Sequence, residues 1–476
     1  MSSSSIGSAI YAGSQTSSTS NNLGQGIDVA ALVQASMANQ TAQLTVMQNQ
    51  QTQLTNEQSA LTSLNTDLQT LQTAMDALTD PVSSLTALTA TSSNTSVLTA
   101  SAISGAATAT HTIVVNNLAT TSSAYSAALA TPSTPLSDGT LTIQVGSNTA
   151  ATATINNEAG TISVQVGSNT PTTTTIDTTN PLASLAQAIN NGNVGVTASV
   201  INDANGSRLA LVSNTSGAPG DLTITASSGL PAFTKGVTGV NASLTVDGIP
   251  ISSTTNTVST AVLGVTLNLL SAAPSTPVTL SVTPDVSQAS TAVTNFANAY
   301  NTVIKDLNTQ FTVDPTTNQP GPLASDSTLS LAQSQILASV SFAMSGNGNI
   351  NSLADLGISF NNDGTMTVDT GALTNALQSN FSSVQSFFQA TNSGSFGANL
   401  VKNINALADP ISGTFAQDLA GLQQTQNNLT SQISDFQNQM NVTQQALTAQ
   451  YDQVNVTLQE LPLLLSQVNQ QLASLG

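Results

Sequence analysis

The amino-acid sequence predicts an α+β multidomain protein, in which a terminal coiled-coil or helical-bundle leg carries inserted antiparallel β-rich domains. Near both ends of the chain, apolar residues recur every three or four positions, a spacing typical of packed helices. Between these ends, short runs rich in Val, Ile and Thr alternate with a period of two, which is typical of strands. The 476 residues also exceed the roughly 100–200 residues of one domain. We therefore expect the two helical ends to pair and the β-domains to be inserted between them.

The first helical pattern runs from Met47 to Leu78. Eight of its ten positions are large apolar residues, and Asp80-Pro81 follows, where proline cannot continue a helix. We interpret this apolar stripe as the core of an intramolecular bundle, with a partner-binding surface as the alternative. The core residues expected from it are Leu54, Leu61, Leu64, Leu68 and Leu71.

A second, longer stripe begins at Phe415, after Asp409-Pro410, and continues to Leu475. Thirteen of its eighteen positions are apolar, polar residues occupy the other five, and Pro462 is expected to kink or break the helix. Because this stripe is far longer than the first, we expect its last part to contact other molecules, with an intramolecular core as the alternative. The expected core residues are Phe415, Leu419, Leu422, Leu429, Ile433 and Phe436. The expected oligomer or filament interface residues are Leu23, Ile27, Leu32, Leu447, Val454, Leu461, Leu464, Val468 and Leu475.

The middle of the chain predicts antiparallel strands, because turn sequences such as Asn205-Gly206 and Asp247-Gly248 separate its apolar runs. Residues 141–155 match residues 162–176 at nine of fifteen positions, and each copy is typical of a strand, a turn and a second strand. Two copies indicate a local duplication within one β-domain, since a solenoid needs at least three. The expected strands lie at 111–115, 141–145, 162–166, 194–201, 209–212, 222–225, 244–246, 265–269 and 278–282.

The helical period returns at Val286. A hairpin is expected at 358–368, and Asp369 is placed to cap the helix that follows. The expected domains are a disordered leader with a terminal leg segment (1–44), a helical bundle (45–83 with 286–439), a β-rich head domain (84–126 with 238–285), an inserted β-rich head domain with the duplicated hairpin (127–237) and a C-terminal helical leg segment (440–476).

The scarcity of charge excludes several classes of partner. The chain has 4 Lys and Arg against 23 Asp and Glu, a formal net charge of −19. Nucleic acids and anionic membrane surfaces are bound by clustered cations, which this chain lacks, so we expect neither as a partner. Since no apolar run reaches about 18 residues, we expect no membrane insertion. Residues 2–22 lack the basic and apolar regions of a cleavable signal peptide.

The sequence gives little support to catalysis or to a cofactor. It has no Cys and a single histidine, His111, which we place on a strand face. Phosphate-loop, dinucleotide and nucleophile-elbow motifs are absent. Asp363-Gly364 resembles a calcium loop only loosely, because Thr370 stands where a bidentate Glu is needed, so a hairpin turn is favoured. We expect no enzyme, no metal and no cofactor.

Several segments together resemble the flagellar hook-associated protein 2 family, whose members cap the flagellar filament. The resemblance begins at Leu23-Gly24-Gln25-Gly26-Ile27-Asp28-Val29 and covers most of residues 23–475, least clearly 127–190. One departure is Gln40-Thr41-Ala42-Gln43-Leu44, where the family often carries a Glu-basic-Ala-Pro-Leu pattern before the first helix. Other matching segments are 90–100, 112–119, 206–213, 240–248, 256–258, 296–304 with Tyr300-Asn301, 353–368 and 451–472.

This resemblance implies a ring-like homo-oligomer, pentamer-like but variable, at the tip of the growing flagellum. Terminal helices would act as legs that reach flagellin and the hook-filament junction proteins, while the β-domains would form the plate under which flagellin folds. The implied location is extracellular. The protein would be exported through the flagellar apparatus with the help of a chaperone, and no signal peptide would be cleaved. The alternative is a surface adhesin that uses the Thr- and Asn-rich segment 84–285, although aromatic residues are only 3% of the chain.

Overall fold

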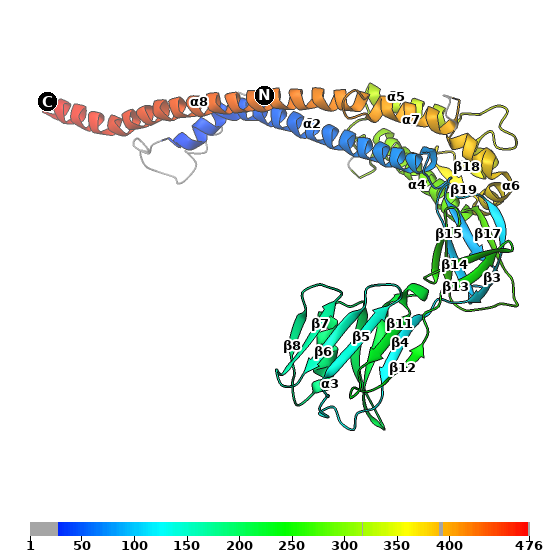
Figure 1. Ribbon diagram of the computed structural model, residues 1–476. Coiled ribbons are helices and arrows are strands. Elements are labelled where there is room, and N and C mark those ends of the chain that lie inside the picture. Colours follow the sequence, from blue (N-terminus) through cyan, green and yellow to red (C-terminus); the bar gives the residue numbers. More distant parts are fainter. Residues whose placement is uncertain (1–26, 317, 390–393, 475–476) are drawn as a thin grey trace. The chain divides into compact units, whose positions relative to one another are not determined.

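The computed structural model describes residues 27–316, 318–389 and 394–474 (Figure 1). The chain divides into two compact units, a helical unit of 1–80 with 290–476 and a β unit of 81–289. Helices lie at both ends of the sequence and antiparallel sheets lie between them. The predicted α+β multidomain class, with inserted antiparallel β-rich domains, is therefore confirmed.

The helical unit packs around apolar side chains that the sequence pattern places on one face of each helix. Phe387 and Phe396 stack with ring centroids 5.1 Å apart, and Phe296 meets Phe396 edge-on at 5.7 Å. Leu64 and Leu71 of the first helix are fully buried as well. The elements are α2 (Val29–Thr79), α4 (Val286–Phe311), α5 (Ser327–Val340), η2 (Leu353–Leu356), β18 (Ile358–Phe360), β19 (Met366–Val368), α6 (Thr370–Gln389), α7 (Phe396–Ala408) and α8 (Thr414–Ala473).

The expected start of the first long helix is wrong. The first helix begins at Val29 and not at Met47, with Asp28 as N-cap, its side chain accepting a hydrogen bond from the Ala31 amide. Residues 40–44 contain no proline, so the helix passes through them without a turn. Pro462 was expected to kink or break the second helix, and α8 is not broken there: the leucines on both sides favour a helix, and only one backbone hydrogen bond is lost.

The β unit contains two cores, each between two sheets. The first lies between a five-stranded and a three-stranded sheet and includes Val115, Leu244, Leu267 and Leu280. The five-stranded sheet has the order β1 (Leu88–Ser92), β17 (Val278–Pro284), β3 (Ala109–Asn117), β13 (Ala242–Val246) and β14 (Ile249–Ser253). The three-stranded sheet has the order β15 (Thr257–Val262), β16 (Val265–Leu269) and β2 (Leu98–Ala102).

The second core is formed by a four-stranded and a five-stranded sheet with one helix, α3 (Pro181–Asn191). The two similar sequence segments become neighbouring hairpins of one sheet, β5–β6 and β7–β8, joined through the β6–β7 pair. The five-stranded sheet has the order β11 (Leu222–Ala226), β5 (Gly139–Val145), β6 (Ala151–Asn156), β7 (Thr161–Val166) and β8 (Thr172–Thr175). The four-stranded sheet has the order β12 (Phe233–Val237), β4 (Thr121–Ser126), β10 (Gly206–Ser216) and β9 (Val196–Asp203), and the turn η1 (Ala218–Gly220) follows β10.

In the helical unit, the β18–β19 hairpin is fastened to α4 by one asparagine. Asn301 Nδ2 donates to the Met366 carbonyl at 2.8 Å, and the Met366 amide donates to Asn301 Oδ1 at 2.6 Å. Next to it, the Tyr300 hydroxyl donates to the Gly364 carbonyl, and burial raises the pKa of Tyr300. Asp363-Gly364 is the hairpin turn, with Gly364 at φ +83°.

Replacing Asn301 with Ala should destabilise the helical unit by about 2 kcal/mol, because a buried amide and carbonyl of Met366 lose their partner. Denaturant unfolding followed by circular dichroism would measure the change. Asn298→Ala, on an exposed position of the same helix, is the matched control. Equal stability of the two variants would contradict the proposed fastening.

In the β unit, carboxylates are stabilised in their charged form by local donors. His111 Nδ1 lies 2.7 Å from Asp247 Oδ2, the Thr112 amide donates to Asp247 Oδ1, and these two contacts lower the pKa of Asp247. The Arg208 guanidinium donates to Asp203 at 2.8 Å and lowers the pKa of that carboxyl. A lowered pKa in the folded state stabilises the fold above the pKa of the unfolded state.

The β unit should therefore lose stability as the pH falls through the lowered pKa values of Asp203 and Asp247, and this loss should be smaller in Asp247→Asn. Asparagine tolerates the φ of +53° at this position, so the turn is kept. Thermal unfolding between pH 7 and pH 3 would measure it, with Glu158→Gln in an exposed turn as control. An unchanged pH profile in Asp247→Asn would contradict the assignment.

Candidate functional site

The candidate site is the antiparallel pair of α2 and α8, which differs in character along its length (Figure 1). Near the end of α2 the pair is apolar. Leu61, Leu64, Leu68 and Leu71 are all buried to 1% exposure or less, and Phe415 of α8 is buried too. This segment therefore has the side-chain burial of an ordinary bundle core.

In the middle of the pair, polar contacts between the helices accompany apolar side chains that are mostly only half-buried. No residue between Met37 and Leu61 of α2 is buried, and hydrogen bonds join the two helices instead. Gln51 donates to Thr430, Gln426 donates to Thr55, and Gln58 donates to Gln423, each at 2.9 Å. Because directional bonds at heptad spacing favour one alignment, they act together with the apolar contacts in setting the register of the two helices.

Three carboxylates of the helical unit, Glu57, Asp67 and Asp306, have raised pKa values, and no cation contributes to their shifts. Burial raises the pKa of Asp67 and of Asp306, and the charge of Asp67 raises the pKa of Asp306 further. The pKa of Glu57 is raised by burial and by the negative charge of Asp326. A raised pKa in the folded state means that these groups add stability as the pH falls through that value, the reverse of the behaviour of Asp203 and Asp247.

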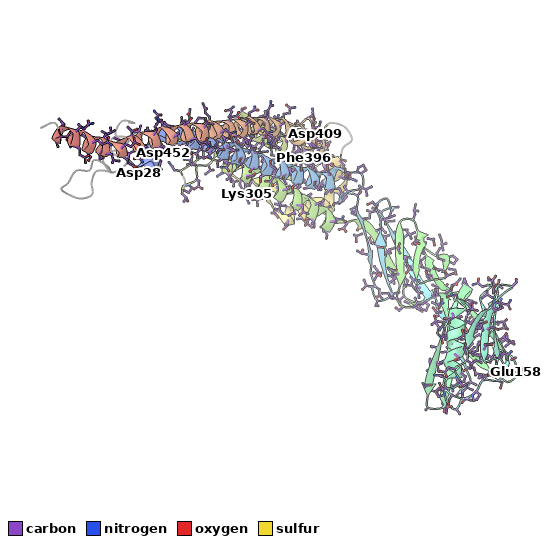
Figure 2. All side chains as sticks on the ribbon, turned by 90° about the vertical axis from the view of Figure 1, so that its left-hand side faces the viewer. Asp28, Glu158, Lys305, Phe396, Asp409 and Asp452 are labelled. Carbon is purple, nitrogen blue, oxygen red and sulfur yellow. The ribbon has the colours of Figure 1, made fainter. Side chains whose placement is uncertain are left out.

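The start of α2 meets α8 at a defined level. Leu32, Val33 and Met37 are buried there, the Ser36 hydroxyl lies 3.0 Å from the Tyr451 hydroxyl, and the Ile27 amide donates to Asn455 Oδ1 at 2.9 Å. In Figure 2 the labels of Asp28 and Asp452 lie close together at this end of the pair. Residues 456–473 of α8, called the α8 tail below, therefore extend beyond the level of Ile27 by about 27 Å.

The α8 tail carries apolar side chains that are 37–67% exposed. Beginning at Leu447 and Tyr451, steps of three and four lead along one face without a polar interruption. The members of this face, called the tail stripe below, are Leu458, Leu461, Leu465, Val468 and Leu472. Tyr451 contacts α2 through Ser36, and the tail stripe follows from Tyr451 along α8 in steps of three and four.

The stripe expected from the sequence differs from this face at every second position, where it takes the preceding residue. It places Leu464 on the stripe together with Gln450 and Thr457, and so it misses Leu458, Leu465 and Leu472. Two successive steps of four, from Thr443 through Leu447 to Tyr451, shift the apolar repeat at this point. That double step is the signal that locates the tail stripe.

The other expected site residues are distributed over all parts of the pair. Leu32 was expected at an interface between molecules but is only 7% exposed within this chain. Val454, Leu461, Leu464 and Val468 are 39–56% exposed. Leu23 and Leu475 lie outside the described residues. The half-buried residues are Ile27, Leu54, Leu419, Leu422, Leu429, Phe436 and Leu447, whereas Ile433 is buried.

Chemistry beyond packing is not evident at this site. Among the described residues there is no group of three or more His, Asp or Glu side chains that could hold a metal ion. Every helix in that part of the chain is too short or too polar to cross a bilayer. The arrangement leaves an apolar helix face exposed.

Comparison with known proteins identifies the family. Residues 25–122 match the model of the flagellar hook-associated protein 2 N-terminus, and residues 239–462 match that of its C-terminus, together more than half of the chain. The chain belongs to the flagellar hook-associated protein 2 family. Between the two matched regions lie residues 123–238, which form most of the second β core.

Individual relatives agree with this family. The B-type flagellar hook-associated protein 2 of Pseudomonas aeruginosa is 29% identical over 307 residues, covering 58% of this chain and 63% of that protein. Flagellar hook-associated protein 2 of Escherichia coli K12 is 30% identical over 226 residues, covering 43% and 48%. The aligned regions thus span less than two thirds of each of these relatives.

A solved structure matches more of the chain. The crystal structure of the flagellar cap protein FliD D1-D2-D3 domains from Escherichia coli has a TM-score of 0.54 and 28% sequence identity, and the match covers 76% of this chain and 99% of that one. These similarities give no support to the adhesin alternative for residues 84–285.

The contrast between bundle core and tail predicts different costs for the same substitution. Leu64→Ala should destabilise the helical unit by about 2–5 kcal/mol, because it empties a fully buried site. Leu464→Ala, on a side chain that is 56% exposed, should change stability by less than about 0.5 kcal/mol. Denaturant unfolding of both variants measures this, and a large loss from Leu464→Ala would mean that the tail is packed within the chain.

Proposed function

We propose that this protein is a structural cap at the distal end of the bacterial flagellar filament. In this role it forms a ring-like homo-oligomer that promotes the folding and polymerisation of flagellin and retains exported subunits. Family membership and the likeness to a flagellar cap protein support this role. The single observation that carries it is the α8 tail, a long helix with an apolar face that no other described helix of the chain continues far enough to cover.

The proposed partners follow from that tail. It suits weakly charged amphipathic helices, which we take to be other copies of this chain, flagellin and the hook-filament junction proteins. The proposed contacts on this chain are Leu23, Ile27, Leu447, Val454, Leu461, Leu464, Val468 and Leu475, to which Leu458, Leu465 and Leu472 are added. The subunit number is proposed to be pentamer-like, as in a closed ring built from one repeated contact.

The proposed site of action is outside the cell, at the flagellar tip. The protein would reach it through the flagellar export apparatus, with a chaperone, without removal of a signal peptide. Its work there is mechanical and not enzymatic: it holds subunits in place while they fold. The domain boundaries given above at 44/45, 83/84, 126/127, 237/238, 285/286 and 439/440 are part of the same proposal.

Deleting the gene in the bacterium of origin should abolish long filaments and release flagellin into the medium, because exported subunits would no longer be retained. The full chain supplied in trans should restore filaments, and a variant without residues 456–474 should not, although it folds. Electron microscopy and assay of flagellin in the medium measure both. The matched control is the double variant Val442→Ser with Val46→Ser, at exposed sites outside the tail. Normal filaments in the deletion strain would contradict the cap function.

A further inference from the structure

The strand β8 is the last of its sheet, and no other described strand covers its outer edge. We propose that this edge binds, by addition of a strand to the sheet, an extended uncharged polypeptide segment in which apolar and polar residues alternate, such as a subunit that has not yet folded exposes. The proposal names the kind of segment that the cap holds, and to that extent it rests on the proposed function.

The backbone of β8 has hydrogen-bonding groups that face away from the sheet (Figure 1). The Ile176 amide donates to the Gly160 carbonyl of the neighbouring strand side at 2.9 Å. Because hydrogen-bonded pairs alternate along an antiparallel ladder, the amides and carbonyls of Thr173 and Thr175 point away from β7. No group in the described part of the chain bonds to them. The edge therefore offers two donors and two acceptors to an added strand.

The internal repeat shows what covers such an edge. In its first copy, Thr152 and Thr154 of β6 stand where β8 has its two outward-facing threonines. There the next strand of the sheet, β7, covers the edge, with Gln165 opposite Thr152 and Ser163 opposite Thr154. No third copy follows β8 in the sheet. The equivalent edge of β8 is thus built to the same pattern but has no strand beside it.

The repeat also specifies the side chains of the bound segment. β7 turns Ile162 and Val164 into the core, on the face where β8 carries Thr174 and Ile176. An added strand with the same alternation would place β-branched side chains beside Thr174 and Ile176, and such cross-strand pairs are favourable. The bound segment is therefore expected to share the pattern of residues 161–166, Thr-Ile-Ser-Val-Gln-Val.

Two other sheet edges of the β unit are protected from strand addition. On β9, Asn190 of α3 takes the place of a strand: its Nδ2 donates to the Ala198 carbonyl at 2.9 Å, and the Ala198 amide donates to its Oδ1 at 2.8 Å. β14 contains Pro250, which has no amide hydrogen. In β8 no proline interrupts the strand, and no charged residue, a common protection of edges, lies between Glu158 and Asp177. The edge of β8 therefore stays accessible to a strand.

The size of this edge suits transient binding. An added strand would form four backbone hydrogen bonds with β8, two with each outward-facing threonine. So small a contact gives weak and quickly reversible binding. A segment held in this way can leave to complete its own fold, as the proposed folding role requires.

A fluorescently labelled peptide of residues 160–167 is the probe. The full chain should bind it in fluorescence anisotropy, and Thr173→Pro should weaken the binding at least about tenfold, because an outward-facing amide is removed. That amide makes no bond to β7, so the sheet should stay intact, which circular dichroism checks. The matched control, Thr173→Val, keeps the amide and should bind like the unaltered chain. Equal binding by Thr173→Pro and Thr173→Val overturns the proposal.

Disulfide formation gives an independent measurement of register, because the chain has no cysteine of its own. A peptide carrying Gln165→Cys should link to the Thr173→Cys chain at least about fivefold more than to the Thr175→Cys chain, since only the first pair stands directly opposite. A peptide carrying Ser163→Cys should show the reverse preference. The absence of a preference in both mixtures would exclude strand addition at β8.

Native mass spectrometry tests the other occupant, a second copy of the chain. Dimers of the full chain that Thr173→Pro abolishes would assign the edge to self-pairing, and the proposal would be wrong. If the peptide fails to bind while the chain restores filaments in the deletion strain, only this inference is wrong. If the peptide binds in the expected register but the chain does not restore filaments, only the cap function is wrong.

Discussion

The structure depends on the difference in length between two helices that pack antiparallel. α2 ends its contact with α8 at Ile27 and Asn455, while α8 continues to Ala473. A heptad face gains its stability only where a second helix covers it, so the same sequence repeat is a bundle core at one end and an exposed surface at the other. The transition between the two is set by where α2 begins.

The middle of the helix pair shows how a chain with few charges specifies an alignment. Amides and hydroxyls of Gln51, Thr55 and Gln58 bond to α8 where ion pairs or leucines are common in other coiled coils. Such bonds contribute little net stability in water but allow one register only. The closely packed bundle core near Leu64 is thus followed along α2 and α8 by a helix contact whose alignment is specific but whose stability is low.

The sequence predicted the fold class, both helical patterns and most strands, because alternation and heptad spacing report directly on which side chains are buried. A strand such as β12, made mainly of exposed residues, has no apolar alternation and was missed, as was the short helix α3. The start of α2 was misplaced because residues 29–46 are rich in Ala, Gln and Thr. Their helicity follows from Asp28 as a cap and from packing at Leu32 and Met37.

The tail stripe illustrates a different limit. Leucine and valine recur along 452–472, but which of them share one face depends on the phase of the repeat, which changes near Leu447. Only the contact between Ser36 and Tyr451 defines which side of α8 faces α2. The exposed fraction of each side chain then distinguishes Leu464, which is exposed, from leucines of the bundle core such as Leu64. Periodicity alone does not make this distinction.

The β unit begins and ends at the same place. Leu88 of its first strand pairs with Pro284 of its last, and the Asp285 amide donates to the Ala87 carbonyl at 2.9 Å. An insertion whose entrance and exit are neighbours leaves the separation of its flanking helices unaffected by its size. The β unit is therefore a replaceable domain: evolution or design can enlarge, shrink or exchange it without disturbing the helices that flank it in the sequence.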